Sequence, residues 1–105
     1  MAVLSQNEPT KDPIIVWFNG GPGCSSLLGF AQEHGPYAME DNTTTFHKND
    51  WSWNMKANVF YIESPAGVGF SICKDQNECK FDDDNSATDN LAVLIALLQE
   101  FPEIN

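Results

Sequence analysis

An apolar run that stops at a cluster of glycines limits most strongly what this chain can fold into. Residues 14–18 read Ile-Ile-Val-Trp-Phe without polar alternation, which predicts a strand buried on both faces, as in a parallel sheet covered by helices. The next residues, Asn-Gly-Gly-Pro-Gly at positions 19–23, can neither continue a strand nor begin a regular helix. A sharp turn with exposed backbone amides therefore follows the strand. Such a turn suits an anion or an oxyanion, or it serves only to let a helix pack closely on its strand.

Beyond this turn, the sequence predicts further strands and helices. They are a short helix over residues 24–34 capped by Ser25 or Ser26, a loose hairpin over residues 37–50 and a second strand over residues 57–62. Trp51 and Trp53, which lie between the hairpin and the second strand, are expected to pack in the core.

A long helix is predicted from Ser86 to about Glu100. Ser86 and Asp89 resemble a capping box with Asp in place of the usual Glu, and Pro102 ends the helix. Its apolar side chains form one broad stripe, which suits a helix docked on a sheet: Leu91, Leu94, Ile95, Leu98 and Phe101. This order of strands and helices indicates the α/β class, with too few strands for a finished doubly wound sheet.

The charge balance excludes several kinds of partner. The 105 residues carry 15 acidic and 5 basic side chains, a formal net charge of −10, and every basic residue is a lysine. Because phosphate affinity comes mostly from Lys and Arg, this negative field disfavours nucleic acids and anionic membrane surfaces. No apolar run approaches the roughly 20 residues of a membrane span. Neither a nucleic-acid partner nor a membrane partner is predicted.

Metal and cofactor sites are not predicted either. A dinucleotide-binding turn would need a third glycine where Ser26 stands, and no Gly-Lys-Ser/Thr ending follows the glycines. Cys73 and Cys79 lack the second pair of a structural zinc site, and the acidic stretch around them lacks the glycine and the closing glutamate of a calcium loop. His34 and His47 are expected to be surface or packing residues.

The cysteine count is odd. Cys73 and Cys79 are close enough in sequence to pair, with two free thiols as the alternative, and this leaves Cys24 alone. In an exported protein, such a cysteine indicates a partner elsewhere, here outside this chain. Asn42-Thr43-Thr44 forms an N-glycosylation sequon, which is used only if the protein enters the secretory route.

Several longer motifs occur in a fixed order along the chain. They are Trp-Phe-Asn-Gly-Gly-Pro-Gly-Cys-Ser-Ser at residues 17–26, Glu-His-Gly-Pro at 33–36, Trp-Asn at 53–54 with Ala-Asn-Val at 57–59, Glu-Ser-Pro-Ala-Gly-Val-Gly-Phe-Ser at 63–71, Asp-Asn at 89–90 and Phe-Pro-Glu at 101–103. With these motifs the sequence resembles the serine carboxypeptidases over residues 9–105. The resemblance implies an α/β-hydrolase fold and an enzyme of the lysosome, the vacuole or the secretory route.

The resemblance also implies a set of site residues. The backbone N–H of Gly21 would be one oxyanion donor, because glycine lets the substrate carbonyl approach the backbone. The family recognises the free C-terminal carboxylate of a peptide through a hydrogen-bond network, which corresponds here to Trp17, Asn19, the Gly20 backbone and Glu33. Held neutral by burial, Glu33 would donate a hydrogen bond to that carboxylate, which favours binding at acidic pH.

The sequence departs from the family because it lacks the catalytic triad. No Gly-x-Ser-x-Gly occurs that would match the family's nucleophile elbow, Gly-Glu-Ser-Tyr-Ala-Gly, and neither histidine matches the family's. Residues 1–105 are therefore expected to be the incomplete N-terminal part of a carboxypeptidase domain. They would form the first central strands and helices of an α/β-hydrolase fold, without its nucleophile-elbow half. The remainder of the parent chain would hold the cysteine that pairs with Cys24.

The expected activity of the parent protein is proteolysis by Ser-Asp-His acyl transfer, on peptides with a free C-terminal carboxylate. The 105 residues alone are expected to be inactive, because they supply only the oxyanion loop and the carboxylate pocket. No cofactor is implied. Two alternatives stay open: a non-catalytic truncated homologue or interaction module, and an acyltransferase on the same scaffold.

Overall fold

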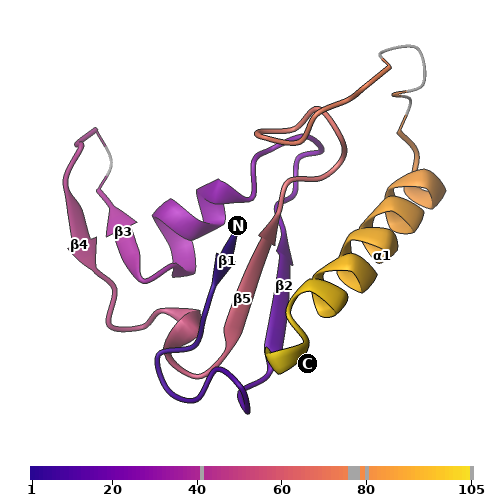
Figure 1. Cartoon of the computed structure of the whole chain (residues 1–105). Helices are drawn as coiled ribbons and strands as arrows, with labels where there is room; N and C mark the ends of the chain where they lie inside the picture. The colour runs from indigo at the N-terminus through magenta and orange to yellow at the C-terminus, as the bar shows by residue number, and fades with distance from the viewer. Residues whose placement is uncertain (41, 76–78, 80, 105) are drawn as a thin grey trace.

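The centre of the molecule is a three-stranded mixed sheet (Figure 1). The computed structural model describes residues 1–40, 42–75, 79 and 81–104. Strand β2 (Ile14–Phe18) pairs in parallel with β5 (Asn58–Ile62), and β1 (Ala2–Val3) pairs antiparallel with β5, so that the order is β1-β5-β2. The parallel pair confirms the two strands that the apolar runs predict.

Burial differs between the two predicted strands because of their places in the sheet. Central strand β5 is almost completely buried, with Val59 and Tyr61 at 0% and 1% exposure. Strand β2 lies at the edge of the described sheet and its residues are half-buried apart from the exposed Phe18, so the expected burial on both faces is wrong for this strand. Strand β1 was not predicted, since two residues carry no periodicity.

A buried asparagine fastens the N-terminal segment to the sheet. Asn58 is completely buried, and its Oδ1 accepts from the backbone N–H of Ser5 at 3.0 Å. Its Nδ2 donates to the carbonyl oxygens of Pro9 and Asp12 at 2.8 and 3.1 Å. Nearby, Nδ2 of Asn54 donates to the carbonyl of Leu4 at 3.0 Å. The side-chain amides of Asn54 and Asn58 thus supply hydrogen bonds to backbone groups of the irregular segment before β2, which pairs with no strand.

One face of the sheet is covered by α1 (Asp83–Glu100) and the short 3-10 turn η3 (Pro102–Ile104). Ile14, Val16 and Phe60 point from the sheet into an apolar cavity of about 290 Å³ that helix leucines and Ile104 also line. In Figure 1 the helix runs alongside β2, on the far side from the β3–β4 hairpin.

The docking of α1 is looser than its apolar stripe predicts. Leu94 and Leu97 are half-buried, Leu91 and Ile95 are 58% and 50% exposed, and no residue of the helix is buried. The two long strands offer the helix a narrow surface, which explains why much of the stripe is uncovered.

Helix α1 also begins earlier than predicted. Asp82 is the N-cap, and its Oδ1 accepts from the backbone N–H of Asn85 at 2.8 Å. Ser86 therefore lies inside the first turn and is not the cap. The carboxylates of Asp82, Asp83 and Asp84 all lie at the positive end of the helix dipole, which favours this earlier start.

The opposite face of the sheet packs on η1 (Gly29–His34), a single π-type segment. This helix is shorter than the predicted residues 24–34, and Leu28 precedes it without a side-chain cap. Of the two predicted caps, Ser25 bonds the start of this helical stretch, because its Oγ accepts from the backbone N–H of Leu27 at 3.2 Å while its hydroxyl donates to Glu63. The Ser26 hydroxyl instead donates to the carbonyl of Ile62 in β5. Helical segments on both faces of a mixed sheet confirm the α/β class.

The predicted hairpin is present as β3 (Tyr37–Met39) and β4 (Phe46–Lys48). Asn42 lies in its turn, exposed, with a φ of 60°. Trp51 follows at 89% exposure, so its expected packing in the core is wrong. Trp53 opens the 3-10 turn η2 (Trp53–Met55), is 44% exposed and has one ring face covered.

Candidate functional site

Two loops leave the same edge of the sheet. The glycine loop, residues 19–23, follows β2, and the 63–71 loop follows β5; because these strands are parallel, both loops emerge at their carboxyl ends (Figure 1). Ligands of α/β sheets bind at such edges. A cavity of about 410 Å³ lies there, and its walls come from the glycine loop, the 63–71 loop and the N-terminal half of α1: Phe18, Asn19, Gly20, Gly21, Pro22, Gly23, Ser64, Pro65, Ser86 and Asn90.

The glycine loop requires glycine at two positions. Gly21 and Gly23 have φ angles of 145° and 89°, which L side chains rarely adopt. A Cβ on Gly21 would also lie 3.0 Å from the backbone nitrogen of Cys24. Residues 20–23 are exposed and line the cavity, and three of these four residues are glycines without a side chain to cover the backbone.

Asn19 is fixed at both its side chain and its backbone. Nε1 of Trp17 donates to Oδ1 of Asn19 at 3.2 Å, and the backbone N–H of Asn19 donates to Oγ of Ser26 at 2.9 Å. The Ser26 hydroxyl in turn donates to the carbonyl of Ile62 at 2.5 Å. The first residue of the glycine loop is therefore tied to the end of β5.

An aromatic cluster lies behind Trp17, on the η1 face of the sheet. His34 is 6% exposed and stacks on Trp53 and on Tyr61, with ring centroids 4.1 and 5.5 Å apart. The ring of Trp17 meets His34 edge-on at 4.5 Å, and Phe30 meets Tyr61 edge-on at 5.5 Å. His34 is therefore a packing residue, as predicted, but one that supports Trp17 directly.

Burial favours the neutral forms of the polar groups of this cluster. It raises the pKa of Tyr61 to about 12, and Nδ1 of His34 forms a 3.1 Å hydrogen bond with the Tyr61 hydroxyl. Burial also lowers the pKa of His34, an effect that the negative charge of Glu33 only partly opposes. Nε2 of His34 is buried and has no hydrogen-bond partner among the described residues.

The predicted site residues are brought together only in part. Trp17 bonds Asn19, and Asn19, Gly20 and Gly21 line the same cavity. Glu33 lies apart, near the end of η1, with an exposed side chain that forms no hydrogen bond to the described residues, so the expected burial of this carboxyl is wrong for the described part of the chain. Its negative charge acts on the pKa of the adjacent His34, whose ring contacts Trp17.

Sequence reasoning missed the part played by Glu63, the first residue after β5. Its Oε1 accepts from the Ser25 hydroxyl at 2.7 Å and its Oε2 from the backbone N–H of Phe70 at 3.1 Å. Burial acts to raise the pKa of Glu63, but the Ser25 hydroxyl and nearby backbone N–H groups outweigh it and hold the pKa below its ordinary value. The only signal in the sequence is an acidic residue directly after a buried strand.

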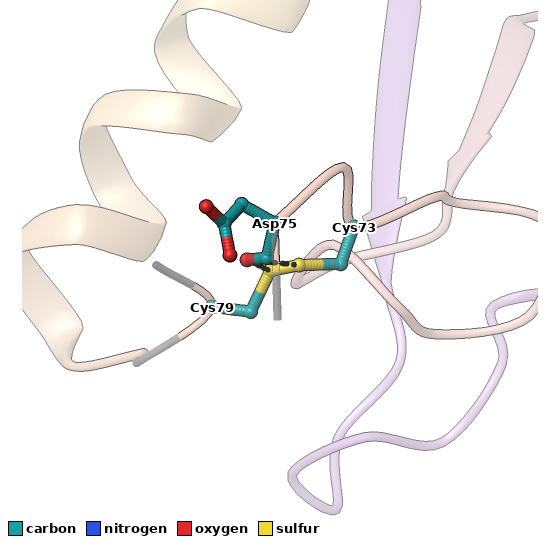
Figure 2. The surroundings of a disulfide bond; sticks show 3 residues. All are labelled: Cys73, Asp75 and Cys79. Carbon is teal, nitrogen blue, oxygen red and sulfur yellow. Dashed lines mark hydrogen bonds between the residues drawn. A yellow bond between two sulfur atoms is a disulfide. The ribbon is translucent and has the colours of Figure 1, made fainter. Parts of the chain in front are cut away.

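The cysteines are arranged as the spacing suggests. Cys73 and Cys79 form a disulfide with their Cα atoms 6.3 Å apart, and both sulfur atoms lie close to the carbonyl oxygen of Asp75, at 3.2 and 3.0 Å (Figure 2). Cys24 is exposed and forms no disulfide within the described part of the chain. The described residues contain no group of three His, Cys, Asp or Glu side chains placed to hold a metal ion.

Comparisons with known proteins agree with one another. A family model described as serine carboxypeptidase matches residues 1–105. The lysosomal protective protein of Mus musculus is 46% identical over 101 residues, and serine carboxypeptidase-like 20 of Arabidopsis thaliana is 41% identical over 106 residues; each match covers 96% of this chain and 21% of the relative. The chain thus spans about a fifth of the length of these relatives.

A solved structure is also similar. The crystal structure of Kex1(delta)p, a prohormone-processing carboxypeptidase from Saccharomyces cerevisiae, superposes with a TM-score of 0.75 at 29% identity. The superposition covers 98% of this chain and 23% of that one. Across the ranges that the structure describes, no helix combines the length and the apolar character needed to cross a membrane.

Proposed function

The chain belongs to the serine carboxypeptidase family, and from this premise we propose that it supplies the oxyanion loop and the C-terminal-carboxylate pocket of a serine-type carboxypeptidase. The parent enzyme hydrolyses C-terminal peptide bonds by Ser-Asp-His acyl transfer. Because the sequence contains no nucleophile elbow, the proposal assigns the triad to another part of the parent protein. The chain then contributes the first central strands and helices of an α/β-hydrolase domain.

The observation that carries this proposal is the position of the glycine loop. It lies at the carboxyl end of β2, its residues 20–23 are exposed, and it lines a cavity of about 410 Å³. In the proposed reaction, the backbone N–H of Gly21 donates to the oxygen of the scissile carbonyl as negative charge develops there. One such donor is worth about 10²–10³-fold in kcat.

The proposed pocket for the substrate carboxylate uses Trp17, Asn19, the Gly20 backbone and Glu33. The bond between Trp17 and Asn19 fixes the amide of Asn19, and the ring of His34 supports Trp17. A neutral Glu33 carboxyl donates a hydrogen bond to the bound carboxylate, whereas an ionised one repels it. Peptide binding by this pocket therefore strengthens as the pH falls.

The same proposal covers the secretory features of the chain. We assign glycosylation to Asn42, which lies exposed in the turn of the β3–β4 hairpin. Cys24, exposed beside the glycine loop, is assigned a disulfide partner elsewhere in the parent protein. The Cys73–Cys79 disulfide suits an oxidising compartment, and an enzyme of the lysosome, the vacuole or the extracellular space meets this condition.

The test uses the full-length natural protein and two peptides that differ only in a free or an amidated C-terminus. Release of the C-terminal amino acid is expected only from the free acid, and a serine-directed fluorophosphonate abolishes it. The 105 residues alone are expected to release nothing. Equal cleavage of both peptides would contradict the carboxylate pocket, and transfer of the acyl group to an added alcohol in preference to water would favour the acyltransferase alternative.

Two substitutions test the pocket residues. Asn19→Ala raises KM for the free acid, because it removes a ligand of the carboxylate, while the matched control Asn42→Gln leaves KM unchanged. Glu33→Gln cannot ionise, so we expect it to remove the part of the pH dependence of KM that a charged carboxylate at this position produces, measured from about pH 4 to about pH 8. A Glu33→Gln profile that matches the wild-type profile would remove Glu33 from the pocket.

A further inference from the structure

We propose that Glu63 is a positioning residue that holds the glycine loop in its productive place by fastening Ser25 to the end of β5. The expected effect on catalysis rests on the proposed function, whereas the attachment of Ser25 to Glu63 is a property of the fold alone. Glu63 lies outside the predicted pocket, and in the described part of the chain its carboxylate forms no hydrogen bond to a residue of the glycine loop. Its effect passes through the segment that follows the loop.

Two adjacent serines connect that segment to β5. The Ser26 hydroxyl donates to the carbonyl of Ile62 and accepts from the backbone N–H of Asn19, while the Ser25 hydroxyl donates to the Glu63 carboxylate. Ile62 and Glu63 are also adjacent, so the two serines make parallel attachments to consecutive residues. The glycine loop is thereby held at both ends, by β2 before it and by this pair of attachments after it.

The Glu63 carboxylate lies against a glycine of its own loop. A Cβ on Gly69, whose φ is 53°, would overlap Oε2 of Glu63, so the carboxylate occupies the space beside a glycine. The chain then turns so that the N–H of Phe70 bonds Oε2 and the hydroxyl of Ser71 bonds the carbonyl of Glu63 at 2.6 Å. The 63–71 loop folds back around the carboxylate that holds Ser25.

The partners of the carboxylate are neutral donors. Backbone N–H groups of Ser26 and Leu27 also act on it, and no salt bridge to Glu63 occurs among the described residues. The titratable groups that share the adjacent cavity with it are Lys74 and Asp89. A glutamine amide keeps only one accepting oxygen and puts an NH2 donor in place of the other, which weakens the bonds that these donors make.

The experiment compares Glu63→Gln with the matched surface control Glu40→Gln in the full-length natural protein. Glu40 lies in the hairpin with an exposed side chain 3.9 Å from His47. Amide hydrogen exchange in residues 19–28 is expected to be at least about tenfold faster in Glu63→Gln than in the wild type or the control. The concentration of active sites is measured by titration with the fluorophosphonate, and kcat per active site of Glu63→Gln is expected to fall by about tenfold to hundredfold.

A second variant keeps the test decisive if Glu63→Gln does not fold. Ser25→Ala leaves the carboxylate in place and removes only the attachment, so it is expected to change exchange and kcat in the same direction by a smaller factor. Unchanged amide hydrogen exchange in residues 19–28 of the folded variants would overturn the proposal. Faster exchange together with a wild-type kcat per titrated active site would overturn it as well. If the wild type hydrolyses no peptide, the proposed function fails, and the exchange result alone supports or overturns the fastening.

Discussion

The buried amide of Asn58 offers a direct test of how the N-terminal segment is held. We expect Asn58→Ala in the natural protein to remove all three of its hydrogen bonds at once. One is to the backbone N–H of Ser5, which is 6% exposed, and two are to the half-buried carbonyls of Pro9 and Asp12. Alanine offers no replacement for any of them.

The size of the loss follows from the burial of each partner. Ser5 is buried, and a buried N–H donor left without a partner costs about 2 kcal/mol. The two half-buried carbonyls regain water in part, at about 0.5 kcal/mol each. The vacated amide volume adds about 1 kcal/mol. The free energy of unfolding should therefore fall by about 4 kcal/mol, a large share of the 5–15 kcal/mol typical of a domain.

Urea unfolding followed by circular dichroism measures this loss. Asn58→Leu separates hydrogen bonding from volume, because it fills the site yet strands the same groups, and we expect it to lose about 3 kcal/mol. Asn7→Ala is the matched control: the side chain of Asn7 is exposed and, among the described residues, bonds only the Asp12 carboxylate, so the change should stay within about 0.5 kcal/mol. A loss below about 1 kcal/mol for Asn58→Ala would refute the reasoning, since it would mean that water reaches these groups.

Three further predictions concern other parts of the molecule. Gly29→Ala places a Cβ 2.5 Å from Nε1 of Trp17, so the indole must move; urea unfolding should show a loss of about 1–3 kcal/mol, and an unchanged near-ultraviolet circular dichroism spectrum would contradict it. Replacing Cys73 and Cys79 by serine should cost roughly 2 kcal/mol by the loop-closure estimate, and non-reducing peptide mapping that found both thiols free would show that no bond existed to lose. Because burial lowers the folded pKa of His34 below its usual 6.5, the unfolded chain takes up the proton first as the pH falls through 6.5, and stability is lost from there down to the folded pKa. His34→Gln should weaken this dependence between about pH 7.5 and about pH 5.5, whereas parallel stability profiles for the two proteins would contradict it.

The features that sequence predicts well are those fixed by neighbouring residues. Strands β2 and β5 are recognisable because each is a continuous apolar run, and the glycine loop because its glycines exclude regular structure. The start of α1 was misplaced because Asp82 and Ser86 are both good caps, and only the structure shows that Asp82 bonds the N–H of Asn85.

The features that sequence does not reveal join residues far apart in the chain. Ser25 and Glu63 are separated by 38 positions, and each has an ordinary local interpretation, as a helix cap and as a loop residue. The stack of His34 on Tyr61 spans 27 positions and depends on the face to which η1 turns. The periodicity of apolar residues does not reveal such pairs, because it indicates only which face of its own helix or strand a residue occupies.

The contact between Glu63 and Gly69 restricts the order in which the sequence can diverge. While the carboxylate occupies its place, any side chain at position 69 displaces it from Ser25 and Phe70, so a substitution there costs those hydrogen bonds whatever its chemistry. Once a shorter residue replaces Glu63, asparagine or aspartate becomes tolerable at position 69, since these residues accept the left-handed backbone. The two positions are therefore expected to covary among descendants of this chain, with the change at 63 coming first.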